Sequence, residues 1–271
     1  MSETPPNLFV RTADNVGRKT LTGIEEIGNG ATIIAQSVFW LFMGPRYGQP
    51  VRAGSVVVQM MEAGIFAIPI LVLLNAAIGV MLAIQSIYML KIFGAEARVT
   101  DGIGFVIVRE FGPLITGILI AGRTGSSLAA RLGTMRINQE LDALHVMGIN
   151  PVRFLVVPAL VAMVIMVPLL TFLCDVASLL AAGLYVQITL DISLAAFFNQ
   201  VVDVLSVGDL MHGLGKSVLF GILICIIGVV NGASVTGGAE GVGKVTTRAV
   251  VQAISAIVLT DMLIVYIATI S

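Results

Sequence analysis

Five long apolar stretches, separated by polar segments, dominate the pattern of this chain. They cover about 64–90, 103–122, 154–190, 214–235 and 249–270. A helix that crosses the hydrocarbon core of a bilayer needs about 20 consecutive, mostly apolar residues. In lipid, a helix is also the structure that satisfies its own backbone hydrogen bonds. The pattern therefore predicts an all-α integral membrane protein, with five transmembrane helices in a transmembrane domain over residues 63–271.

Residues 1–62 have a different pattern, with a polar beginning and one shorter apolar run at 31–43. That run is too short to cross a bilayer. It contains Trp40 and has basic residues on both sides, which is typical of a helix that lies in the membrane interface. The sequence thus predicts a polar N-terminus followed by an N-terminal interfacial helix.

The third apolar stretch, 154–190, is too long for one straight crossing and barely long enough for two. Charge decides between these alternatives, because the cytoplasmic flanks of membrane helices carry an excess of Lys and Arg. The segment before the stretch holds four arginines, whereas 191–212 holds three aspartates and no Lys or Arg. The two ends therefore lie on opposite sides of the membrane. We expect one long helix, bent near Pro158 or Pro168.

The same rule sets the orientation of the whole chain. Eleven of the 15 basic residues fall in segments that this topology places inside. The N-terminus is therefore expected in the cytoplasm and the C-terminus outside. The amphipathic segment 193–205 would then lie on the outer surface.

The longest polar insertion, 123–151, separates the second and third apolar stretches. It has apolar residues at helical spacing, and Gly148 followed by Asn150-Pro151 supplies a helix stop and a break. One interpretation is a soluble loop that happens to be helical. The other is a cytoplasmic coupling helix between spans 2 and 3 that inserts into a motor protein, with Glu140 and Asp142 facing basic groups of that partner. In this second interpretation Leu141, Leu144 and Met147 fill an apolar groove.

Composition excludes several classes of protein. The chain is 57% hydrophobic and 11% charged, against about 25% charged in soluble domains. A net charge of -1 argues against nucleic acid as a partner, since binding would need a basic face. Cys174 and Cys225 lie in apolar runs without metal-ligand spacing. No metal site is predicted.

Residues 238–244, GAEGVGK, match the first seven positions of a phosphate-binding P-loop. The eighth position should be Ser or Thr, which would bind magnesium, but it is Val245. The segment also follows a membrane helix, whereas the motif needs a preceding strand. We therefore predict a flexible turn and no ATPase site in this chain, which is not itself an enzyme. Energy for any transport would come from another subunit.

Ionisable residues within the apolar stretches are candidates for function, because they are costly in lipid. Arg109 and Glu110 lie near the start of the second stretch. They either line a functional cavity or form an interfacial pair that reaches the outer headgroups. Asp175 and Asp261 are interpreted as hydrogen-bonding groups between helices rather than proton carriers. A competing class of function remains, an ion- or proton-coupled carrier of a hydrophobic substrate that works without an ATPase partner.

Two segments are similar to the MlaE/YrbE permease family, the membrane subunits of MCE-type ABC lipid transporters. They are VREFGPLITGILIAGRTGSSLAARLGTMRINQELDALHVMGINPVRFLVVPAL (108–160) and GAEGVGKVTTRAVV (238–251). The resemblance implies a homodimer in the bacterial inner membrane, an ABC ATPase subunit that binds ATP and Mg, and a periplasmic ring of MCE-domain proteins. It also implies a phospholipid substrate, held in an outward-facing cavity at the dimer interface.

The resemblance assigns residues to two sites. The lipid-binding residues that it implies are Leu82, Met89, Leu90, Phe93, Arg109, Glu110 and Phe111. The implied ATPase-coupling residues lie in a coupling helix over 134–150 and are Arg136, Glu140, Asp142, Leu144 and Met147. Glu140 is the expected key contact. No cofactor is implied for the chain itself.

Overall fold

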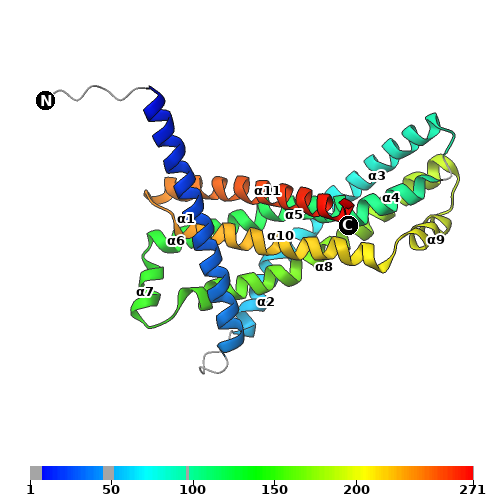
Figure 1. Cartoon of the computed structure of the whole chain (residues 1–271). Helices are drawn as coiled ribbons and strands as arrows, with labels where there is room; N and C mark the ends of the chain where they lie inside the picture. The colour runs from blue at the N-terminus through cyan, green and yellow to red at the C-terminus, as the bar shows by residue number, and fades with distance from the viewer. Residues whose placement is uncertain (1–7, 45–51, 96–97, 271) are drawn as a thin grey trace.

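The computed structural model describes residues 8–44, 52–95 and 98–270, and within these ranges every regular element is a helix (Figure 1). Parts of the predicted N-terminal region, residues 1–7 and 45–51, lie outside the described residues. Among the described residues, five helices are long and apolar enough to cross a membrane, and they follow an N-terminal helix. The predicted fold class is confirmed. The five helices extend over Ala53–Ile92, Val99–Ile137, Val152–Leu190, Val207–Ala233 and Gly238–Ile270.

The third apolar stretch forms one continuous helix, as the charge pattern predicts. It begins with a π-helical turn, Val152–Val156 (η5), and continues as α8 (Val157–Leu190) with Pro168 inside it. The short helix α9 (Leu194–Val204) follows and buries Phe197 and Val201. We call this end of the bundle the α9 end, and the opposite end, where α7 (Glu140–Val146) lies, the α7 end (Figure 1).

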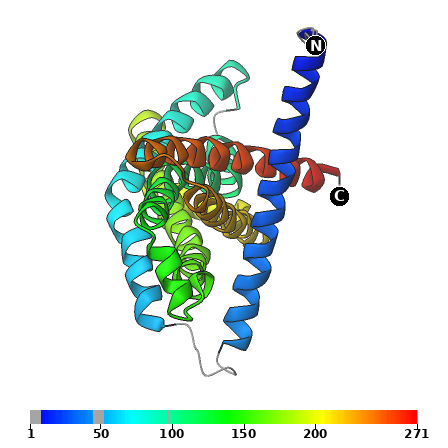
Figure 2. The ribbon, with the colours of Figure 1, turned by 90° about the vertical axis from the view of Figure 1, so that its left-hand side faces the viewer.

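The N-terminal helix α1 (Leu8–Met43) is much longer than the apolar run at 31–43. The reason lies in the position of the prolines, which are absent from 8–43 but occur at Pro5-Pro6 and Pro45. In both views α1 runs across the long helices instead of along them (Figures 1 and 2). It contacts α8, α10 (Val207–Ala233) and η5.

The first spanning segment starts earlier than the predicted residue 64. It consists of α2 (Ala53–Ala63), a 3-10 turn at Ile65–Ala67 (η1), and α3 (Ile68–Ile92). Pro69 lies in the first turn of α3, where its missing N–H costs little, so the proline marks the bend. At the bend, a Cβ atom on Gly64 would overlap the side chain of Met166.

The last two spans also begin before their predicted starts. Ser206 caps α10 by accepting from Asp209 N, and the Asp209 carboxylate accepts in turn from Ser206 N (3.1 Å). This capping box adds two turns ahead of the apolar run. The helix α11 (Gly238–Ile270) begins with GAEGVGK, so the predicted flexible turn is wrong. The turn lies just before it, where Gly237 and Gly238 have positive φ.

The helix α8 is the centre of the bundle and packs against α2, α3, α5 (Gly112–Ile120) and α10. Close approach to α3 depends on Gly79, because a Cβ atom there would overlap the backbone of Ser178. The Ser178 hydroxyl donates to Asn75 O across the same contact (2.9 Å). In the absence of an aqueous driving force, small residues and such hydrogen bonds stabilise helix pairs in membranes.

Residues 134–150 do not form the single helix that was predicted. The helix α6 (Ser126–Ile137) ends at Asn138, and Gln139 has a left-handed backbone with φ 60°. Only then does α7 run over Glu140–Val146. The predicted stop is confirmed: Gly148 has φ 73°, and Ile149 N donates to Leu144 O (2.9 Å).

Candidate functional site

Arg109 and Glu110 lie in a π-helical turn, Ile107–Phe111 (η3), between α4 (Val99–Val106) and α5. Such turns insert one residue into an α-helix and occur frequently at functional sites. Both side chains are about a quarter exposed, and each has an ionic partner on α10. The guanidinium of Arg109 also lies over the ring of Phe105, 5.1 Å from its centroid.

Five charged residues from η3, α10 and α11 form one connected group, which we call the charge cluster. Arg109 Nη1 donates to Asp209 Oδ1 (3.0 Å), and Arg109 Nε lies 3.8 Å from Glu110 Oε1. Lys216 Nζ donates to Glu110 Oε2 (2.5 Å) and lies 3.0 Å from Asp261 Oδ1. Charged groups at membrane depth need such partners, because lipid does not solvate them.

Lys216 is the most deeply buried member, with a side chain only 1% exposed. It is held between two carboxylates from different spans, Glu110 and Asp261, so it ties α10 to η3 and α11. The sequence interpretation did not place Lys216 or Asp209 at this site. A signal was available, since Lys216 is the only charged residue in the predicted span 214–235. A lone lysine there requires an acidic partner on another helix.

Asp261 therefore connects two helices, as expected, through an ion pair. Asp175 is different: it is 3% exposed, and its Oδ1 has no hydrogen-bond partner among the described residues. The carboxyl group packs directly against the backbone of Gly112, where a Cβ atom would overlap Oδ1. The position of Asp175 thus requires a glycine at position 112. Gly112 is two residues after Glu110 of the charge cluster.

The other predicted lipid-binding residues fall into two groups. Leu82 and Leu90 are partly buried against an apolar cluster at the α9 end, to which Val108 belongs. Met89 and Phe93, on the same end of α3, are 48% and 76% exposed. Phe111 is half-buried in η3. The exposed apolar end thus belongs to a helix, α3, that contacts α4 and α5, the two helices flanking η3.

The predicted coupling residues are distributed over α6, α7 and the turn after it. Arg136 Nη1 donates to Asp142 Oδ1 (2.9 Å), and Asn138 Nδ2 donates to Glu140 Oε1 (3.1 Å). Leu144 is 9% exposed, so it offers little surface to a partner, and its coupling role stays a prediction. The apolar side chains that α7 offers to a partner are instead Val146 and Met147, which are 89% and 63% exposed.

Among the described residues, five membrane-length helices with charged residues paired between them define a multi-pass helical membrane protein. The sequence profile of a family described as Permease MlaE matches residues 56–267. The chain belongs to this family and is an ABC transporter permease. In an ABC transporter a separate ATPase subunit acts together with the permease, so this chain has an ATPase partner.

Curated relatives agree with this assignment. A probable ABC transporter permease of Rickettsia felis is 29% identical over 257 residues, covering 95% of this chain and 97% of the relative. A probable ABC transporter permease of Synechocystis is 36% identical over 204 residues, covering 75% of this chain and 77% of the relative. The Arabidopsis thaliana chloroplastic protein TRIGALACTOSYLDIACYLGLYCEROL 1 is 29% identical, covering 95% of this chain and 80% of the relative.

Proposed function

We propose that this chain is the membrane permease of an ATP-driven lipid transporter, and that it holds a phospholipid at the α9 end. The observations that carry the proposal are the charge cluster and the exposed apolar end of α3, a helix that contacts α4 and α5 on either side of η3. The Arabidopsis relative supports it, because that protein is named after a glycolipid, trigalactosyldiacylglycerol. Membership of an ABC permease family favours this function over a carrier that works without an ATPase.

The chemistry of a phospholipid fits this end of the molecule. Each acyl CH₂ gains about 0.8 kcal/mol from an apolar environment, so two chains leave a bilayer only if apolar side chains shelter them. Exposed Met89 and Phe93 offer such surface, and Arg109 offers a cation for the phosphate. We propose that a second copy of this chain completes the cavity around these residues.

The orientation we propose places the α7 end in the cytoplasm of a bacterial inner membrane. The arginines and lysines of α6, η5 and the start of α11 lie toward this end, which agrees with the charge bias of cytoplasmic segments. The ATPase, with its ATP and Mg, would then bind at α7. The α9 end would face the periplasm, where a ring of MCE-domain proteins would receive or deliver the lipid.

A photo-crosslinker at position 111 tests lipid binding at the α9 end. Phe111 is replaced by benzoylphenylalanine, which has a similar shape and fits this half-buried position, in cells grown with ³²P-phosphate. We expect ultraviolet light to attach ³²P-labelled lipid to the permease. Replacing Leu219 on α10, which is 45% exposed, with the same amino acid provides a control for random capture from the bilayer. Equal labelling at both positions would contradict a lipid site at the charge cluster.

Charge reversal at Glu140 tests the proposed ATPase contact. The Glu140→Lys variant is expected to weaken ATPase binding by at least about tenfold, because like charges would face each other across the interface. Co-purification of the ATPase with the tagged permease, together with its rate of ATP hydrolysis, measures this. Glu240→Lys is the matched control, since Glu240 is 78% exposed and begins α11 near the same end. Normal assembly and hydrolysis in Glu140→Lys would exclude the coupling role.

A further inference from the structure

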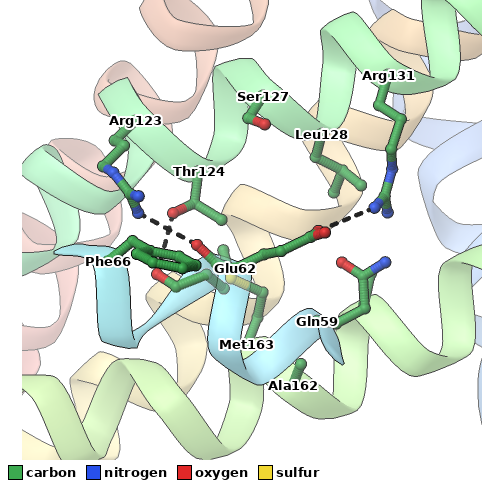
Figure 3. A pocket seen from close by; sticks show the side chains of 12 residues that line it. Gln59, Glu62, Phe66, Arg123, Thr124, Ser127, Leu128, Arg131, Ala162 and Met163 are labelled. Atoms are coloured by element: carbon green, nitrogen blue, oxygen red, sulfur yellow. Dashed lines mark hydrogen bonds and ion pairs between the residues drawn. The ribbon is translucent and has the colours of Figure 1, made fainter. Parts of the chain in front are cut away.

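A cavity of about 340 Å³ lies toward the α7 end, away from the charge cluster, between α2, α6 and α8. Figure 3 shows Arg123, from the π-helical turn η4 (Ala121–Gly125), and Arg131, from α6, reaching toward Glu62 of α2, one on each side of it. Apolar side chains of α6 and α8 form the floor, among them Leu128 and Met163. The cavity therefore has a polar rim and an apolar interior.

The polar rim is held by contacts between α2 and the second span. Arg131 Nη1 donates to Glu62 Oε2 (3.1 Å), and Arg123 Nη1 donates to the backbone oxygen of Glu62 (3.3 Å). Thr124 Oγ1 donates to the backbone oxygen of Ala63 (3.3 Å). Two arginines face a single carboxylate, so the lining has a net charge of +1. The cavity favours an anion.

Arg131 supplies an independent indication of a ligand. Its Nε and Nη2 atoms are covered and have no hydrogen-bond partner among the described residues, although the side chain as a whole is 35% exposed, so a ligand reaches them only after the side chain turns. Buried donors of a charged group are rarely left unpaired, because the loss of hydration is costly. A guanidinium presents these donors in a planar fork that matches the oxygens of a phosphate. The chemistry that would satisfy Arg131 is a phosphate-type anion.

The depth of the cavity agrees with a lipid headgroup. Arg109 and Arg123 are 14 positions apart on one continuous helix, which corresponds to about 21 Å of rise. The hydrocarbon core of a bilayer is about 30 Å thick. Arg109 and Arg123 are therefore separated by about two thirds of the core, and Arg123 lies toward the opposite headgroup layer. Phe66, 66% exposed, stands at the rim and offers an apolar wall to an acyl chain.

We propose that this cavity binds the phosphate of a lipid headgroup in the leaflet at the α7 end, with Arg123 and Arg131 as the phosphate ligands. The inference rests on the proposed lipid transport and deepens it, since it gives the permease a second lipid site on the other side of the membrane. Glu62 competes with the phosphate for Arg131, so binding requires the carboxylate to move aside.

Crosslinking at position 66 tests this proposal in the full transporter. Benzoylphenylalanine replaces the exposed Phe66 in cells grown with ³²P-phosphate, and the permease is purified after illumination. We expect attached ³²P-lipid, reduced at least about fivefold by Arg123→Gln with Arg131→Gln, since each guanidinium contributes a charge-assisted hydrogen bond. Lys244→Gln removes an exposed positive charge, 75% exposed and near the same end, and should leave the label unchanged.

A second variant separates binding from a purely structural role. Glu62→Gln removes the competing carboxylate, so lipid labelling should rise, although the variant loses the same ion pair as Arg131→Gln. The proposal would be overturned if labelling fell equally in Glu62→Gln and in the double arginine variant. It would also be overturned if labelling persisted in the double arginine variant.

A binding assay with inorganic phosphate distinguishes a site for a lipid phosphate from a site for a soluble phosphate ion. Inorganic ³²P-phosphate is dialysed against detergent-purified permease. Arginine-dependent binding of inorganic phosphate without lipid crosslinking would replace the lipid site by a site for a soluble anion. The crosslink at position 111 is read in the same cells. If position 66 is labelled and position 111 is not, the proposed function at the α9 end is contradicted. If position 111 is labelled and position 66 is not, this inference is contradicted.

Discussion

The Lys216→Met variant is expected to lose on the order of 3 kcal/mol of stability, because it leaves Asp261 without its ionic partner and Glu110 with only Arg109, 3.8 Å away. Lys216 is 1% exposed and lies between Glu110 and Asp261. Methionine preserves most of the side-chain volume, so the effect measures charge and not a cavity. The fraction of monodisperse permease after heating in detergent, followed by size-exclusion chromatography, reports the loss.

Two further variants make this result specific. Lys244→Met, at a residue whose side chain is 75% exposed, should leave stability unchanged. A triple variant, Lys216→Met with Glu110→Gln and Asp261→Asn, should recover most of the lost stability. Replacing a buried lysine together with its carboxylate partners by uncharged side chains can be nearly neutral. The triple variant should nevertheless fail in lipid transport. If it remained as unstable as Lys216→Met, unpaired charge would not be the cause.

The Gly79→Val variant is expected to separate α3 from α8 and to prevent accumulation of folded permease. The obstacle is the backbone of Ser178, which cannot rotate away as a side chain could. Inserting atoms into a well-packed contact costs about 1–3 kcal/mol, and more where backbone must shift. The Ser178 hydrogen bond to Asn75 O would be lost at the same time. The yield of monodisperse protein from membranes measures the effect.

Gly102→Val is the matched control for this prediction. Gly102 lies in α4, and an added Cβ atom would meet nothing within 4 Å. Both variants carry the same helix-propensity cost of a β-branched residue. A similar yield for the two would show that the contact between Gly79 and Ser178 tolerates expansion.

The spans were predictable because crossing a bilayer requires a single property of the sequence, a long apolar run. About 20 apolar residues must be consecutive, and that signal is visible without any knowledge of packing. The single crossing at Val152–Leu190 was also predictable, since charge on its flanks depends on topology alone. The first residues of the helices were harder to predict from the sequence. The capping box at Ser206 and Asp209 extends α10 through polar sequence that hydropathy treats as a loop.

The charge cluster could be predicted only in part. Arg109 and Glu110 were recognised as candidates from their depth, but their partners on α10, and Asp261 of α11 behind Lys216, depend on how three helices pack. Glu110 and Lys216 are 106 positions apart, and nothing local in the sequence joins them. The same applies to Leu144, whose helical spacing suggested a partner-facing stripe, although the fold turns it inward.

The order of the charge cluster along the chain has a consequence for biogenesis. Glu110 enters the membrane with the second span, Lys216 with the fourth and Asp261 with the fifth. A lysine at the centre of an isolated helix costs about 2.5–3.5 kcal/mol to insert. When Lys216 leaves the translocation machinery, the carboxylate of Glu110 is already in the bilayer and can pair with it. The polypeptide thus inserts one carboxylate partner of Lys216 before it and the other directly after it.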